Sequence, residues 1–150
     1  MGNMGLTEKE QERLIEAFKG RDRVVRVLSQ DGFFRVTMIK NTNSAQEAQK
    51  RHNLSYYSAF LLSRALAASS MMASFLKGQE RISLEFTGDG AIRKVFAEAL
   101  QVGEQRGYIE YNNTDKIEIQ STNDLLGKGN LSVVRFLYNK KEPINIIIPL

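Results

Sequence analysis

The 150-residue sequence contains no cysteine and a single histidine, His52. Without cysteine, this sequence has no disulfides, thiolate zinc sites or cysteine nucleophiles. A hydrolase triad or a histidine metal cluster would depend on His52 alone, which follows Arg51 in a charged turn and is expected to be a surface or capping residue. The residues therefore predict no catalytic group and no metal ligand.

Long runs of one charge are also missing. The net charge is +4, but no five consecutive residues carry the same sign, so the signature of a nucleic-acid-binding arm is absent. Four glutamates lie between residues 8 and 16, where a signal peptide would need an apolar segment, and this argues against export. We expect a cytoplasmic protein with one globular domain, residues 21–150, after an N-terminal extension, residues 1–20.

Two glycine-containing segments fail as nucleotide-binding motifs. A phosphate-binding loop would need glycine where Thr122 stands and Ser or Thr where Gly129 follows Lys128. In a dinucleotide fingerprint beginning at Gly88, the third glycine is replaced by Arg93. We expect the glycine segments to form structural turns. For the function of the chain, we predict binding and not catalysis. The expected turn residues are Gly88, Asp89, Gly90, Gly127 and Gly129.

A long apolar segment begins near Ser55 and contains one charged residue, Arg64. It predicts a helix without a polar face, and such a helix is buried within a protein when it does not span a membrane. We expect Arg64 to be paired inside the core, and Met71 and Met72 to be core residues. Covering this helix on both sides requires two layers. The predicted fold is α+β, a three-layer β/α/β sandwich with central helices between two mostly antiparallel sheets.

The remaining segments alternate between turn residues and strand patterns. Residues 7–20 predict a capped short helix, with Leu14, Ile15 and Phe18 on one side. Asp31-Gly32 predicts a tight hairpin. The expected strands are residues 24–30, 33–39, 82–87, 92–100, 105–111, 116–120, 131–138 and 144–148, and residues 43–51 are expected to form a polar helix. Residues 112–115 are expected to form a turn.

The last two strands are apolar on both faces. Such strands are either buried on both sides, which we expect here, or they present an apolar surface to a partner. The candidate binding residues are Val134, Phe136, Tyr138, Ile146 and Ile148, with Phe33 and Phe34 behind them. An uncovered strand of this kind could also pair two copies of the chain into a homodimer.

An ordered set of short motifs carries a family resemblance. The motifs are Arg51-His52-Asn53, Met71-Met72, Leu76-Lys77-Gly78, residues 88–90, Arg106-Gly107-Tyr108 and Gly127-Lys128-Gly129 before Leu131. In order and spacing they resemble the N-terminal domain of the heat shock protein 33 family, the 33 kDa chaperonins, over about residues 22–150. The resemblance implies a stress-response chaperone of the holdase type. Such a chaperone binds unfolding proteins through apolar surface without nucleotide, and it is not an enzyme.

The sequence departs from this family at one point. The family continues into a linker and a small C-terminal domain whose four cysteines bind zinc and act as a redox switch. This sequence has no cysteine. We expect the natural protein to continue into such a domain, and we assign neither zinc nor redox control to any residue of this chain, for which no cofactor is expected.

Two other classes of function remain. The mildly basic composition, with aromatic residues near Arg26, Arg35 and Arg135, is compatible with a nucleic-acid or protein-interaction module that uses a basic sheet face. Binding by such a face should weaken steeply with salt, whereas apolar binding should not. An enzyme would need a deep pocket with convergent polar groups around Arg64 or Asp89.

Overall fold

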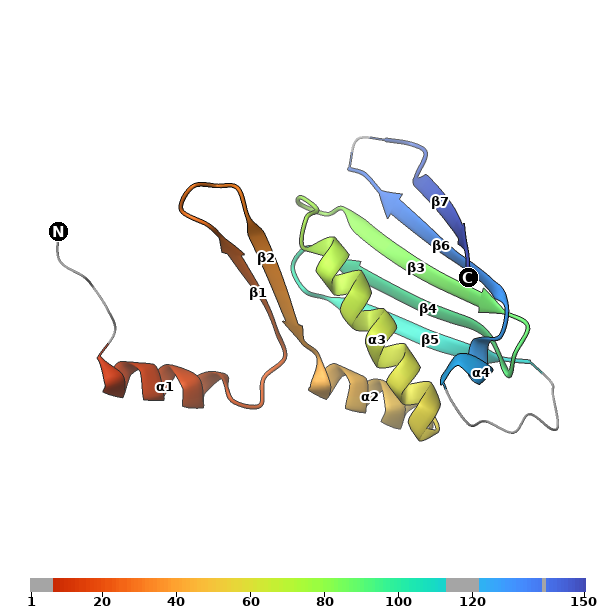
Figure 1. Ribbon diagram of the computed structural model, residues 1–150, viewed down its shortest axis with the longest axis horizontal. Coiled ribbons are helices and arrows are strands. Elements are labelled where there is room, and N and C mark those ends of the chain that lie inside the picture. The colour runs from red at the N-terminus through yellow and green to blue at the C-terminus, as the bar shows by residue number, and fades with distance from the viewer. Residues whose placement is uncertain (1–6, 113–121, 139) are drawn as a thin grey trace.

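The computed structural model describes residues 7–112, 122–138 and 140–150, and Figure 1 shows their arrangement. Four helices and seven strands follow one another in these residues. They are α1 (Glu8–Phe18), β1 (Arg23–Leu28), β2 (Arg35–Lys40), α2 (Thr42–His52), α3 (Tyr56–Ala73), β3 (Arg81–Gly88), β4 (Ile92–Leu100), β5 (Gln105–Tyr111), α4 (Thr122–Leu126), β6 (Gly129–Phe136) and β7 (Ile144–Pro149).

The strands form two antiparallel sheets, and the central helices lie between them. The larger sheet has the strand order β5-β4-β3-β6-β7, and β1 and β2 form a separate hairpin. Helix α3 packs against β3, β4 and β5 of the larger sheet and also contacts β2 of the hairpin (Figure 1). The predicted α+β class, with helices between two antiparallel sheets, is confirmed.

The core lies where α3 meets the larger sheet. Leu62 and Leu66 of α3 pack with Val95 and Ala97 of β4, and Leu125 of the short helix α4 closes one end of this cluster. A second cluster at the end of α3 contains Ala73, Leu76, Ile82 and Ala99. The alternating apolar residues of β3 and β4 therefore face α3, as the period-two pattern predicts.

Local signals determine where the helices begin and end. The Thr7–Glu10 capping box at the start of α1 is present as predicted, and Ser55 accepts a hydrogen bond from the Ser58 amide at the start of α3. Helix α2 ends at His52, and the C-cap residue Asn53 that follows has a left-handed backbone (φ 48°). His52, the last residue of α2, is exposed as expected.

The expectation that α3 is buried on every side is wrong. Its apolar side chains Met71 and Met72 are each 39% exposed, and Arg64 lies at the surface with its guanidinium 5.6 Å from the centre of the Phe60 ring. The reason is the width of the second layer. The five-stranded sheet covers one side of α3, but the two-stranded hairpin is too narrow to cover the other.

The first hairpin is longer than the two-residue turn that Asp31-Gly32 predicts. Strand β1 ends at Leu28 and β2 begins at Arg35, and the Ser29 amide donates to the Phe34 carbonyl (2.8 Å). Asp31 accepts hydrogen bonds from the Ser29 hydroxyl and the Phe33 amide within this loop. These local hydrogen bonds compete with the strand ladder. Phe33 and Phe34 therefore belong to a loop, not to a strand.

The other strands largely follow the prediction. Strand β5 has the expected bounds, and β6 and β7 differ from theirs by one or two residues. Helix α4 was not predicted. The predicted strand 116–120 and most of the turn 112–115 lie outside the described residues.

Candidate functional site

Strand register decides which side chains share a face of the larger sheet. Residues paired across antiparallel strands point to the same side. Val133 packs against the core beside α3, and it pairs with Ile146 on β7. Ile146 therefore lies on the α3 side of the sheet. Val134 pairs with Asn145 and points to the opposite side. The candidate residues thus divide between two faces and do not form one surface.

The first of these surfaces is here named the β6–β7 strip. It lies on the α3 side of the sheet, and its apolar residues are Leu131, Val133, Ile144, Ile146 and Ile148. Arg135, which pairs with Ile144, lies on the same side. Ile146 is 56% exposed and Ile148 is 45% exposed. Helix α3 packs on β3, β4 and β5, and among the described residues no element other than the paired strand β6 packs extensively on β7 (Figure 1).

The expected burial of the last two strands is therefore wrong for β7, all of whose residues are exposed, whereas β6 is mostly half-buried. Strand β7 is also the edge of the larger sheet. The outer edge of such a strand presents N–H and C=O groups that can pair with another extended segment. Apolar surface and pairing capacity thus occur on the same strand.

The opposite face of the sheet is covered by its own side chains. The guanidinium of Arg81 lies 4.2 Å from the centre of the Phe136 ring, and Phe96 stacks on Tyr108 with ring centres 5.2 Å apart. Val134 and Phe136 are half-buried here. The sequence-predicted residues of β6 therefore offer less free apolar area than those of β7.

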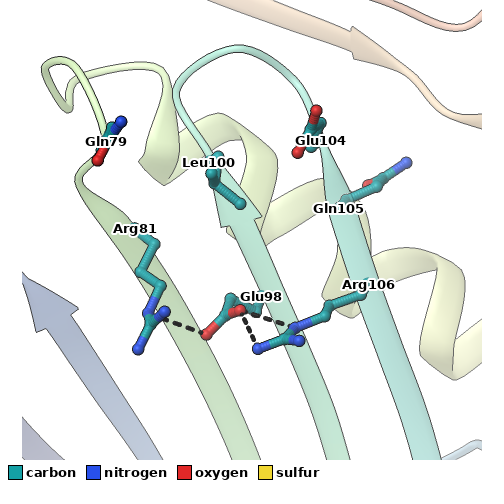
Figure 2. A pocket seen from close by; sticks show the side chains of 7 residues that line it. All are labelled: Gln79, Arg81, Glu98, Leu100, Glu104, Gln105 and Arg106. Atoms are coloured by element: carbon teal, nitrogen blue, oxygen red, sulfur yellow. Dashed lines mark hydrogen bonds and ion pairs between the residues drawn. The ribbon is translucent and has the colours of Figure 1, made fainter.

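Charged residues on this face are paired with one another. The carboxylate of Glu98, 4% exposed, lies between Arg81 (3.5 Å) and Arg106 (2.7 Å), as Figure 2 shows. Lys94 lies 3.2 Å from Glu85, and the hydrogen bond from Lys94 to that carboxylate raises the pKa of Lys94. An open depression above Glu98 is lined by Gln79, Arg81, Glu98, Leu100, Glu104, Gln105 and Arg106.

Three candidate residues lie on neither face of the larger sheet. Phe33 and Phe34 are 82% and 70% exposed in the loop of the separate β1–β2 hairpin. Tyr138 is exposed in the turn after β6. The exposure of these three residues agrees with a binding role. They do not, however, lie on the sheet face that carries Ile146 and Ile148.

The basic residues singled out by the sequence do not form one face either. Arg26 donates to the carbonyl of Gln101 (3.0 Å), and Arg35 lies over the ring of Phe75. Arg135 lies on β6 of the other sheet, where it is paired with Glu80 (3.2 Å). Because these arginines contact separate groups on two sheets, they offer no continuous track for a phosphate backbone.

Comparison with known proteins identifies the chain. A family model described as Hsp33 protein matches residues 22–150. The chain belongs to the Hsp33 family.

The Hsp33 relatives are named chaperonins. The chain is 34% identical over 124 residues to the 33 kDa chaperonin of Prochlorococcus marinus strain AS9601, covering 77% of this chain and 41% of that protein. It is 32% identical over 130 residues to the 33 kDa chaperonin of Desulforamulus reducens, covering 82% of this chain and 43% of that protein. The chain thus spans less than half the length of these relatives.

A solved structure has the same fold. The crystal structure of the 33 kDa chaperonin (heat shock protein 33 homolog) from Thermotoga maritima aligns with a TM-score of 0.74 and 29% identity, covering 85% of this chain and 45% of that chain. The resemblance stated from the short motifs is confirmed, and with it the assignment to a chaperone family.

The glycine motifs that point to Hsp33 hold two loops together. The Asp89 amide donates to the carbonyl of Lys128 (3.0 Å), and the Lys128 amide donates to Asp89 Oδ1 (2.7 Å). A Cβ on Gly129 would overlap the carbonyl group of Thr87, and one on Gly88 would overlap that of Leu126. These contacts support the predicted structural role of the turn residues.

The zinc implied by the Hsp33 resemblance does not fit the residues present. The sequence has no cysteine, and across residues 7–112, 122–138 and 140–150 no group of three or more His, Asp or Glu side chains could hold a metal ion. Within the same described ranges, no helix is long and apolar enough to cross a membrane.

Proposed function

We propose that this Hsp33-family chain acts as an ATP-independent holdase in the cytoplasm and binds unfolding proteins through the β6–β7 strip. The observation that carries the proposal is the exposed apolar row on the α3 side of β7, the edge strand of the sheet. Membership of a chaperone family supports the same conclusion.

The strip matches what an unfolding protein exposes. Apolar segments would cover Ile144, Ile146 and Ile148, which contributes about 25 cal/mol for each Å² removed from water. An extended segment would also satisfy the outer backbone groups of β7 by strand addition. Neither interaction depends on a particular sequence, so binding of many different clients is expected. Redox control is not proposed for the residues of this chain.

Suppression of citrate synthase aggregation at elevated temperature tests the proposal. The chain in several-fold excess is expected to reduce light scattering without added nucleotide. Ile146→Asp should weaken this suppression because it places a charge in the strip. Ile147→Asp is the matched control, since Ile147 is exposed on the same strand but pairs with Ser132 and faces the opposite side.

Two results would contradict the proposal. One is the absence of suppression by the folded wild-type chain, and the other is an equal loss of suppression in both variants. Salt provides a further distinction, because apolar client binding should persist at 0.5 M NaCl whereas binding to a basic face falls steeply. The molecular mass of the chain alone, measured by static light scattering without citrate synthase, would show whether β7 instead pairs two copies of the chain.

A further inference from the structure

Helix α1 precedes the region that matches the Hsp33 family model, which begins at residue 22. Its sequence is amphipathic, with the apolar residues Leu14, Ile15 and Phe18 at intervals of three and four residues on one side, where Gln11 also lies. Ile15 is 67% exposed, and α1 packs extensively on no other described element. An amphipathic helix gains most of its stability by packing its apolar side, so α1 needs a surface to cover.

An uncovered apolar surface lies on the hairpin that follows α1 in the described residues. The β1–β2 hairpin has one face toward α3, where Thr37 contacts Ser74 (3.2 Å). The other face is here named the outer hairpin face. By strand register it carries Val25, Val27, Val36 and Met38, with Arg23 and Lys40 at one end. Three of the four apolar residues, Val27, Val36 and Met38, are more than half exposed.

The two surfaces agree in size and in charge. Helix α1 has 11 residues and β1 has six, so each is about 16–20 Å long. Four glutamates against Lys9 and Arg13 make α1 net negative. The outer hairpin face is flanked by Arg23 and Lys40, which would lie near the carbonyl end of α1, where cations are favoured.

The connection between them is short and can turn. Residues 19–22 join α1 to β1, and Gly20 has a φ of 83°, a conformation that glycine adopts without strain. An antiparallel return of the helix along β1 would place Gln11 above Val27 and Ile15 above Val25. A connection of four residues holds the two surfaces at a high effective concentration.

We propose that α1 folds back along the outer hairpin face of its own chain, covering Val25, Val27, Val36 and Met38 with its apolar side. This contact involves the N-terminal extension and the hairpin only. It leaves the β6–β7 strip open and does not depend on the proposed chaperone function.

Cross-linking of introduced cysteines tests the contact directly, because the chain has no cysteine of its own. The full chain with Gln11→Cys and Val27→Cys, treated with a short bismaleimide, is expected to give an internally cross-linked monomer by gel and mass spectrometry. Gln11→Cys with Ile147→Cys, an exposed position on β7, is the control and is expected to give none. Circular dichroism confirms that both variants are folded.

Two substitutions in the double-cysteine chain separate docking from chance encounter. Ile15→Asp places a charge on the apolar side of α1 and should lower the yield of cross-linked monomer about tenfold. Arg13→Asp places the same residue on the polar side and should not lower the yield. No cross-linked monomer, equal yields in the two variants, or a cross-linked dimer in place of the monomer would overturn the proposal, and the dimer would show that α1 docks on a second copy.

Discussion

Glu98 and Arg106 are joined by two short contacts on the face of the larger sheet that points away from α3. Oε1 of Glu98 accepts a hydrogen bond from Nε of Arg106 (2.8 Å) and lies 2.7 Å from its Nη2 (Figure 2). The carboxylate is buried while Arg106 is largely exposed. Such a carboxylate depends on its arginines for the hydrogen bonds that water would otherwise supply.

Glu98→Gln is expected to lower the free energy of unfolding by about 1–2 kcal/mol, since hydrogen bonds to charged groups are lost while the exposed arginines regain water. Urea denaturation measures the change. Glu110→Gln is the control, because the Arg93–Glu110 pair is more exposed, and its effect should stay below about 0.5 kcal/mol. Equal losses in the two variants would show that burial of Glu98 adds nothing to its pairing.

Gly129→Ala should be among the most destabilising substitutions in the chain. The added Cβ meets the backbone of Thr87, which cannot move without breaking the β3–β6 ladder. We expect a loss of about 3 kcal/mol or more. Gly32→Ala is the comparison, since its Cβ meets nothing within 4 Å and the cost comes from the positive φ of 76° alone, about 1 kcal/mol. Thermal unfolding distinguishes the two, and similar losses would contradict the steric explanation.

The elements predicted correctly are those determined by short-range patterns. Gly88 ends β3, Asp89 and Gly90 lie in the turn before β4, and Thr7 is the N-cap of α1, because turn and capping residues act within a few positions of themselves. The exposure of Met71 and Met72 could not be predicted in this way. This exposure depends on the number of strands in the sheet that covers each side of α3. That number is determined by pairing between strands that are far apart in the sequence.

The candidate surface was predicted in composition but not in arrangement. Ile146 and Val134 both lie in strands with two apolar faces, so the sequence alone gives no reason to separate them. Their separation follows from the register of β6 against β7, in which Val134 pairs with Asn145. A slip of one residue would exchange the two faces. Glu98 was missed for a related reason, because its arginines come from the two neighbouring strands.

Asp22 is expected to make stability depend on pH in the acidic range. Burial opposes ionisation, but hydrogen bonds from the Ser44 hydroxyl and from the amides of Asn43 and Ser44 lower the pKa of Asp22 below its ordinary value of 3.8, with Lys40 helping. A lowered carboxyl pKa contributes stability above the unfolded value, and this contribution is lost as the pH falls through the folded value.

The difference in unfolding free energy between wild type and Asp22→Asn should therefore be full at about pH 6 and should shrink as the pH falls below 3.8. Urea titrations at several pH values measure it. Asp124→Asn, at an exposed position in α4, serves as a second aspartate substitution for comparison. A difference for Asp22→Asn that stays constant down to about pH 3 would contradict a stabilising role for the ionised carboxylate.

Phe136→Ala tests which face of the larger sheet binds unfolding proteins. Phe136 is half-buried beneath Arg81 on the side away from α3, so its loss should lower the free energy of unfolding by about 1–2 kcal/mol. It should leave suppression of citrate synthase aggregation unchanged at temperatures where the variant is folded. Ile146→Asp should have the reverse pattern, with weaker suppression and a smaller loss of stability, because Ile146 is exposed at the sheet edge. If folded Phe136→Ala lost suppression while Ile146→Asp retained it, the client-binding surface would lie on the opposite face, with Val134 and Phe136.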